Sequence, residues 1–101
     1  MSNSVYALQA RLKAKPEKAD EVAEFLESAL PMAEDEQGTT TWFALRFDET
    51  TFGIFDTFPD EDARQAHLDG DIAAALMENA DELLAEEPQI DHVDVLAAKH
   101  P

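Results

Sequence analysis

The side chain in this sequence best suited to proton transfer is that of His67. The pKa of an unperturbed histidine is about 6.5, so modest changes in its surroundings move its charge state across neutral pH. His67 stands beside the apolar stripe of a predicted short helix, on the side expected to face a sheet. Two interpretations are open: His67 is a catalytic base, or it is a structural histidine that makes hydrogen bonds near a helix end.

Aromatic side chains in the predicted strands are candidates for binding a flat ligand. Trp42 could stack on an aromatic ring, and Phe43 and Phe55 could line the same pocket. Each of them could equally be a core residue, and Trp42 could lie in a dimer interface. Tyr6 could donate a hydrogen bond into such a cavity, although its place in a strand favours an ordinary sheet aromatic.

Arg46 is one of only three arginines and falls inside an otherwise apolar strand. A guanidinium there could bind an oxyanion or a carboxylate of a ligand. An ion pair with Asp56 is the favoured interpretation, because the two residues would lie on neighbouring strands of a hairpin.

Metal and cofactor sites are not expected. The chain has no cysteine, which excludes disulfides, thiolate catalysis and cysteine-ligated metal centres. His92 follows Asp91, but consecutive residues of a strand point to opposite faces, so these two side chains cannot converge on one ion. The sequence also contains no phosphate-binding loop, nucleophile elbow or dinucleotide-binding fingerprint.

The elements that must position these residues follow from hydrophobic periodicity. Alternating or β-branched runs predict strands over residues 5–13, 39–47, 51–58 and 89–98. Helical spacing predicts one helix from Pro16 to about residue 33, which Pro31 kinks or ends. Two further helices are expected over residues 60–70 and from Asp71 to Pro88.

This order, βαββα(α)β, predicts an α+β fold of the ferredoxin-like class, with a four-stranded antiparallel sheet and helices on one face. The length fits one domain, spanning residues 1–101. The strand at 39–47 is apolar on both faces, so a single copy would leave apolar surface in water. We therefore expect a homodimer that covers the open side of the sheet. One face of this strand carries Trp42, Ala44 and Arg46, and the other carries Phe43, Leu45 and Phe47.

The net charge of −16, from 23 acidic and 7 basic residues, limits the possible partners. Such a surface repels phosphate backbones, so neither nucleic acid nor an anionic membrane is an expected partner. The abundance of acid and the scarcity of lysine also fit a protein that works in high salt, or equally an acidic protein of an ordinary cytoplasm. No apolar run approaches a membrane span and the first residues lack signal-peptide features, so a cytoplasmic location is expected.

Several short stretches, in order and spacing, resemble the antibiotic biosynthesis monooxygenase (ABM) family. The resemblance covers residues 5–98. The stretches that carry it are RLKAKP at 11–16, FPDEDA at 58–63, AHL at 66–68 and LLAEEP at 83–88. It implies a small dimeric α/β-barrel protein with a cavity between sheet and helices in each protomer. Characterised relatives oxidise polycyclic phenols or quinols with O2 and no added cofactor, others degrade haem, and many have no known activity.

The sequence departs from the family pattern at two places. Many relatives carry Pro-Gly-Cys and an aromatic residue before the second strand, where this chain has QGTTTW at 37–42. Many also carry a second histidine in a Ser-Pro-His setting, where this chain has DGDI at 69–72. The Asn-Trp-His set of haem degraders has no clear counterpart.

The leading functional hypothesis is a cofactor-independent, homodimeric monooxygenase-like protein that oxidises a small aromatic or quinol substrate with O2. His67 would act as the base, and Trp42, Phe43, Phe55, Arg46 and Tyr6 would contact the substrate. The alternative is a non-catalytic dimer of the same fold that binds a small ligand or a partner, and the missing second histidine favours it. A haem-degrading monooxygenase is a more distant alternative.

Overall fold

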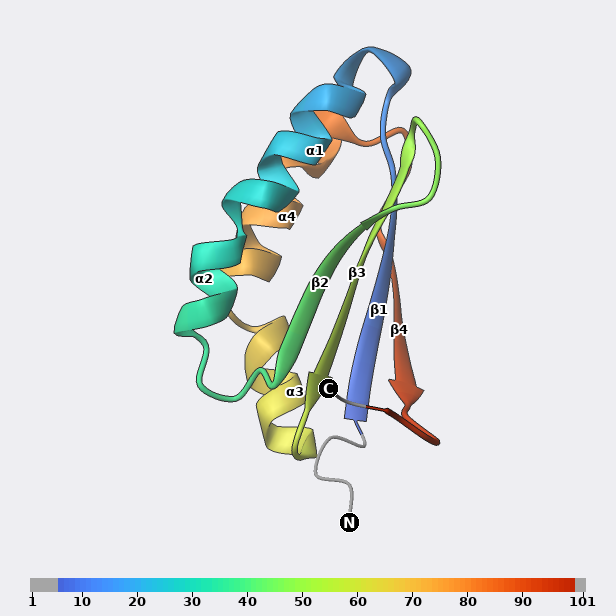
Figure 1. The fold of residues 1–101 in the computed structure, drawn as a ribbon. Coiled ribbons are helices and arrows are strands. Elements are labelled where there is room, and N and C mark those ends of the chain that lie inside the picture. The colour runs from blue at the N-terminus through green and yellow to red at the C-terminus, as the bar shows by residue number, and fades with distance from the viewer. Residues whose placement is uncertain (1–5, 100–101) are drawn as a thin grey trace.

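The computed structural model describes residues 6–99, and the elements follow the predicted order (Figure 1). Neighbouring strands are antiparallel and lie in the order β2-β3-β1-β4. This confirms the ferredoxin-like α+β class. The strands are β1 (Tyr6–Lys13), β2 (Thr41–Arg46), β3 (Thr51–Phe58) and β4 (Gln89–Asp94). Val5, predicted to begin the first strand, lies outside the described residues, and the last strand ends at Asp94 instead of residue 98.

The helical layer lies on one side of the sheet (Figure 1). It consists of a short 3-10 turn η1 (Pro16–Lys18) and the helices α1 (Ala19–Ser28), α2 (Leu30–Asp35), α3 (Glu61–Leu68) and α4 (Asp71–Leu83). The first predicted helix is divided at Ala29, because Pro31 lies in the first turn of α2 and has no N–H to continue the hydrogen bonds of α1.

The core lies between the sheet and the helices. Its side chains come from alternate positions of β1 and β3, as expected when one face of a strand is covered. They meet apolar residues of α1 and α4, where the helical period places one stripe toward the sheet. The main cluster consists of Ala10, Leu12, Ala14, Val22, Leu26, Phe52, Ile54, Leu76, Leu83 and Leu84.

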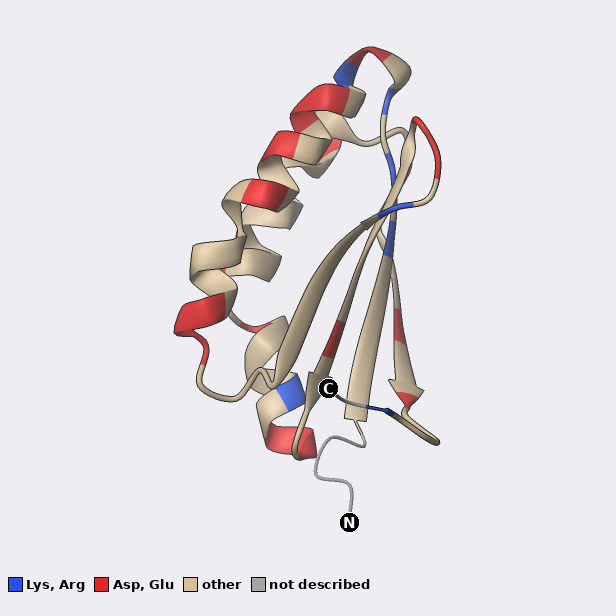
Figure 2. Cartoon of the chain, in the orientation of Figure 1, with Lys and Arg blue, Asp and Glu red and all other residues tan. Residues whose placement is uncertain are grey.

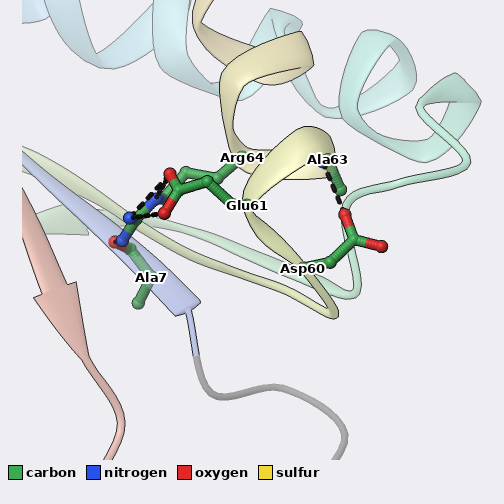
Figure 3. Close-up of polar contacts among 5 residues, drawn as sticks. All are labelled: Ala7, Asp60, Glu61, Ala63 and Arg64. Carbon is green, nitrogen blue, oxygen red and sulfur yellow. Dashed lines mark hydrogen bonds and ion pairs between the residues drawn. The ribbon is translucent and has the colours of Figure 1, made fainter.

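Polar contacts fix α3 against the sheet (Figure 3). Asp60 caps the helix, because its Oδ1 accepts a hydrogen bond from the backbone N–H of Ala63 at 2.8 Å. The buried guanidinium of Arg64 pairs with Glu61 in the same helix and donates to the backbone carbonyl of Ala7 in β1 at 3.3 Å. Arg64 thus ties α3 to the first strand, one turn before His67.

The other face of the sheet has no helices over it, and aromatic surface is exposed there. Phe43 and Phe47 are 51% and 47% exposed. The ring of Phe47 lies over Gly53, where an added Cβ would come within 2.9 Å of the ring. The guanidinium carbon of Arg11 lies over the same ring, 4.5 Å from its centroid.

Acidic side chains lie along the outward side of α1, and Figure 2 shows the same excess of acid on α2. In α1 the buried Val22 and Leu26 alternate with exposed Glu21, Glu24 and Glu27. The acids therefore form a solvated helix face, as the sequence indicates. Among the described residues, no helix has both the length and the apolar character needed to cross a bilayer.

Candidate functional site

His67 lies in the last turn of α3 with its imidazole ring between two carboxylates. Nδ1 is 2.5 Å from Oε1 of Glu36, and Nε2 is 2.9 Å from Oδ2 of Asp56. The ring also packs against the buried Phe58, with 5.3 Å between ring centroids. An imidazole donates from both nitrogens only when it is protonated, so this arrangement suits an imidazolium.

Asp56 is a carboxylate inside the sheet. It lies in β3 on the helix side, opposite Leu8 of β1 and Trp42 of β2, and its residue is 1% exposed. Both carboxylate oxygens are buried, and neither makes a well-aligned hydrogen bond to the described residues. The contact between Nε2 of His67 and Oδ2 of Asp56 is therefore close enough for an ion pair, but the N–H bond does not point straight at the oxygen. His67 is the cation that compensates this buried charge.

Glu36 approaches His67 from the opposite side. It follows directly after α2, where the backbone becomes extended, and its side chain is 22% exposed. The hydroxyl of Thr39 donates to the same Oε1 atom at 2.7 Å. One carboxylate oxygen thus accepts hydrogen bonds from two side chains, one in the loop after α2 and one in α3.

The pKa values of His67 and Asp56 are both raised. Burial alone would lower the pKa of His67, but the close contact and charge of Asp56, and then the hydrogen bond and charge of Glu36, outweigh burial and raise the pKa above 6.5. Burial raises the pKa of Asp56 above 3.8, against the lowering effect of His67. At neutral pH we expect His67 to be protonated and to hold its proton between the two acids.

Two hollows adjoin this ring. The larger is an open cleft of about 350 Å3 between the end of α2, the loop after it and α3, and both Glu36 and His67 line it. The smaller is an apolar cavity of about 40 Å3 on the sheet side, which Asp56 and His67 line together with leucine and isoleucine side chains. The cleft has the volume of a small-molecule site, whereas the inner cavity is large enough only for one or two water-sized molecules.

The geometry does not favour a metal ion at this ring. Glu36 and Asp56 face opposite nitrogens of His67, so the two carboxylates do not converge on one point. Within residues 6–99, no group of three or more histidine, aspartate or glutamate side chains is placed to hold a metal ion.

The structure does not bring the other predicted site residues to His67. Phe43 and Phe55 pair across β2 and β3 on the open face of the sheet, away from the helices. Trp42 faces the helices and packs against the core, beside a separate hollow at the edge of β2. Tyr6 lies at the start of β1, with the guanidinium of Arg64 5.2 Å from its ring centroid.

The predicted ion pair between Arg46 and Asp56 is wrong. The register of the hairpin places Arg46 opposite Phe52 and Asp56 opposite Trp42, so the two residues lie at different heights on neighbouring strands. Arg46 donates instead to the backbone carbonyls of Asp48 and Glu49 in the turn, at 3.3 and 3.0 Å. The ion-pair partner of Asp56 is therefore His67 and not Arg46.

Glu36, Thr39 and the role of Asp56 were missed by the sequence argument. Asp56 carries a usable signal, since it is the one charge in a strand whose other residues are apolar or small. Such a charge needs a buried partner or a function. Glu36 carries no such signal, because it ends the acidic run at 34–36, which resembles a solvated helix end.

Comparisons with known proteins agree with the fold. A protein of unknown function from Nitrosomonas europaea is 56% identical, with 98% of this chain and 96% of that chain covered and a TM-score of 0.95. A protein from Caulobacter crescentus, provisionally assigned as an antibiotic biosynthesis monooxygenase, is 22% identical, with 94% and 92% covered and a TM-score of 0.77. No curated protein matches the chain significantly. The model of the family described as antibiotic biosynthesis monooxygenase matches residues 5–88. The chain therefore belongs to the antibiotic biosynthesis monooxygenase family.

Proposed function

We propose that this protein is a cofactor-independent monooxygenase-like enzyme that oxidises a small phenol or quinol with O2 in the cleft beside His67. The observation that carries the proposal is a buried histidine, held between two carboxylates, on the wall of a cleft of small-molecule size. Membership of the family supports the reaction class. An aromatic ring would lie against the apolar part of the cleft, which Met32, Ala63 and Ala66 form.

The reaction needs the phenol as its anion, because the anion is rich enough in electrons to reduce O2. The phenolic proton passes to Glu36, the carboxylate that lies both at His67 and in the cleft. The imidazolium of His67 then stabilises the phenolate oxygen. For a simple phenol the balance is ArOH + O2 → quinone + H2O. One oxygen atom enters the ring as a carbonyl, the other leaves as water, and the substrate supplies all four electrons.

The role of His67 in this proposal differs from that of a free base. Both ring nitrogens face carboxylates, which raise the pKa of His67 and so favour the protonated ring. His67 acts as the cation that stabilises the anion, and Asp56 keeps the ring charged and oriented from behind.

The proposal is tested by oxygen uptake with a panel of hydroquinones and naphthols under air. We expect His67→Gln to reduce the uptake rate by about 10²–10³-fold, the usual loss when one group that stabilises a developing oxyanion is removed. His92→Gln is the matched control, because His92 is exposed on β4, and it should retain the full rate. Absence of uptake with every substrate, or an equal rate in both variants, contradicts the proposal.

One observation favours a second candidate, a non-catalytic protein that binds a small ligand. Both nitrogens of His67 are already occupied by carboxylates of its own chain, which is also what a purely structural histidine requires. Binding of a hydroquinone to the cleft without any oxygen uptake would identify this function.

The proposal includes a homodimer formed through the open face of the sheet. Phe43 and Phe47 leave aromatic surface in water on this face of a single chain, and the ring of Phe47 contacts Arg11 and lies close to Gly53. An exposed aromatic surface suits packing against a second copy of itself. The cleft lies on the opposite side, among the helices, so this pairing would leave it open.

A further inference from the structure

Glu36 occupies a site whose donors are arranged for an oxyanion. Its Oε1 atom accepts from Nδ1–H of His67 at 2.5 Å and from the hydroxyl of Thr39 at 2.7 Å. Two converging donors at these distances are the usual means of stabilising a negatively charged oxygen. Both donors and Glu36 itself line the open cleft, so a ligand in the cleft would lie directly beside this atom.

We propose that Oε1 of Glu36 stands in for a ligand oxygen, and that the cleft binds small monoanions, phenolates or carboxylates, which displace Glu36 from His67 and Thr39. This inference rests on the proposed function and names the chemical class of ligand for the same site. When no ligand is bound, the carboxylate of Glu36 occupies the oxyanion site, so a ligand must displace Glu36 in order to bind.

The degree of burial indicates that a ligand would displace Glu36 and not His67 or Asp56. The side chains of His67 and Asp56 are 8% and 2% exposed, whereas that of Glu36 is 22% exposed and begins a loop. Moving Glu36 into water therefore costs little desolvation. Moving His67 would leave Asp56 as an uncompensated charge in an apolar cavity.

Charge decides which ligands fit. An anion that replaces Glu36 leaves the charge around His67 unchanged, whereas a neutral ligand would deprive the imidazolium of one partner. Asp35 and Asp71 also line the cleft, so a second negative charge on the ligand would be repelled. The site should therefore take one anionic oxygen on an apolar body and should reject phosphate.

The test is a binding titration with 4-nitrophenol as the probe, followed by its absorbance and by the 15N signals of the His67 ring. Glu36→Ala should bind 4-nitrophenolate at least tenfold tighter than the wild type and should hold it as the anion at a lower pH than in free solution. Glu34→Ala, which removes a carboxylate two residues earlier, in α2, should bind like the wild type. Acetate should compete with the probe, and inorganic phosphate should not.

Three results would overturn the inference: Glu36→Ala binds no tighter than Glu34→Ala, the His67 ring signals do not change on binding, or phosphate competes as well as acetate. If Glu36→Ala does not fold, Glu36→Gln serves in its place, since the amide keeps the shape and removes the charge. Thr39→Val in either background should weaken binding. The titration needs no turnover, so binding without oxygen uptake keeps this inference and rejects the proposed function. Oxygen uptake by the wild type, with no tighter binding of 4-nitrophenolate by Glu36→Ala, keeps the proposed function and rejects this inference.

Discussion

At the scale of single residues, the chemistry of this protein depends on His67 and the two acids around it. The buried carboxylate of Asp56 favours the protonated form of the ring, and the ring lies at the cleft because α3 ends there. Neither acid is near His67 in the sequence, so local patterns mark His67 and the isolated charge of Asp56 but do not pair them. The pairing becomes visible only when the register of β3 and the position of the loop after α2 are known.

The raised pKa of His67 makes stability depend on pH. A group whose pKa is higher in the folded state stabilises the fold fully below its unfolded pKa, about 6.5, and this stabilisation is lost as pH rises through the folded value. Asp56, whose pKa is also raised, acts in the same direction from about 3.8 upward. We therefore expect the free energy of unfolding to fall as pH rises above about 6.5, by about 1.4 kcal/mol for each pH unit by which the folded pKa of His67 exceeds the unfolded one.

Urea unfolding at constant ionic strength measures this dependence. His67→Gln should abolish most of the slope above pH 6.5, and His92→Gln, at an exposed position on β4, should leave it unchanged. A wild-type curve that is flat or rises over this interval would show that His67 is not a buried imidazolium.

At the scale of elements, α3 is the part that positions the site, and Arg64 is its anchor (Figure 3). The side chain is almost fully buried and donates to the carbonyl of Ala7, whereas its partner Glu61 is 60% exposed. Exposed ion pairs stabilise little, so the hydrogen bond to β1 and the packing of the buried guanidinium should matter more than the pair itself.

Replacement of Arg64 should therefore separate these two contributions. We expect Arg64→Met to lower the free energy of unfolding by about 1–3 kcal/mol, the cost of losing a charged hydrogen bond at a buried site. Glu61→Gln should change it by less than about 1 kcal/mol. Denaturant unfolding of both variants decides the matter, and equal losses would mean that the ion pair is the true anchor.

The sequence predicts most element boundaries but not the register of the hairpin. Asp60 marks the start of α3 because a capping side chain acts locally, and the structure has it there. Gly70 instead precedes α4 with an ordinary negative φ, and Asp69 follows the last residue of α3. The pairing of β2 with β3 depends instead on how Asp48 closes the turn, where its side chain accepts from the backbone N–H groups of Thr50 and Thr51. That turn sets Arg46 opposite Phe52 and leaves Asp56 free for His67, which strand patterns alone cannot reveal.

At the scale of the whole molecule, the two faces of the sheet have different uses. The helix face holds the core and the site, and the open face presents Phe43 and Phe47. The net charge of −16 should keep copies apart unless an apolar contact outweighs it.

The open face therefore offers a direct test of assembly. We expect the wild-type protein to sediment as a dimer, and Phe43→Arg to sediment as a monomer, because it places a charge in the centre of the apolar surface. Met77→Arg is the matched control. Met77 is 59% exposed on α4, on the helical side, so this variant should remain a dimer. Monomeric wild-type protein at micromolar concentration, or a dimer that survives Phe43→Arg, would reject pairing through this face.

Trp42 gives the molecule a built-in optical reporter. It is the only tryptophan in the chain, and it packs against both apolar clusters, the main one and the smaller one formed by Ala29, Ala33 and Ile72. Its indole N–H is buried and has no hydrogen-bond partner among the described residues. Fluorescence from a shielded indole is blue-shifted, so an emission spectrum taken during unfolding should move to the red as soon as α2 separates from β2. The emission maximum of Trp42 therefore reports on the separation of α2, and with it the loop that carries Glu36, from β2.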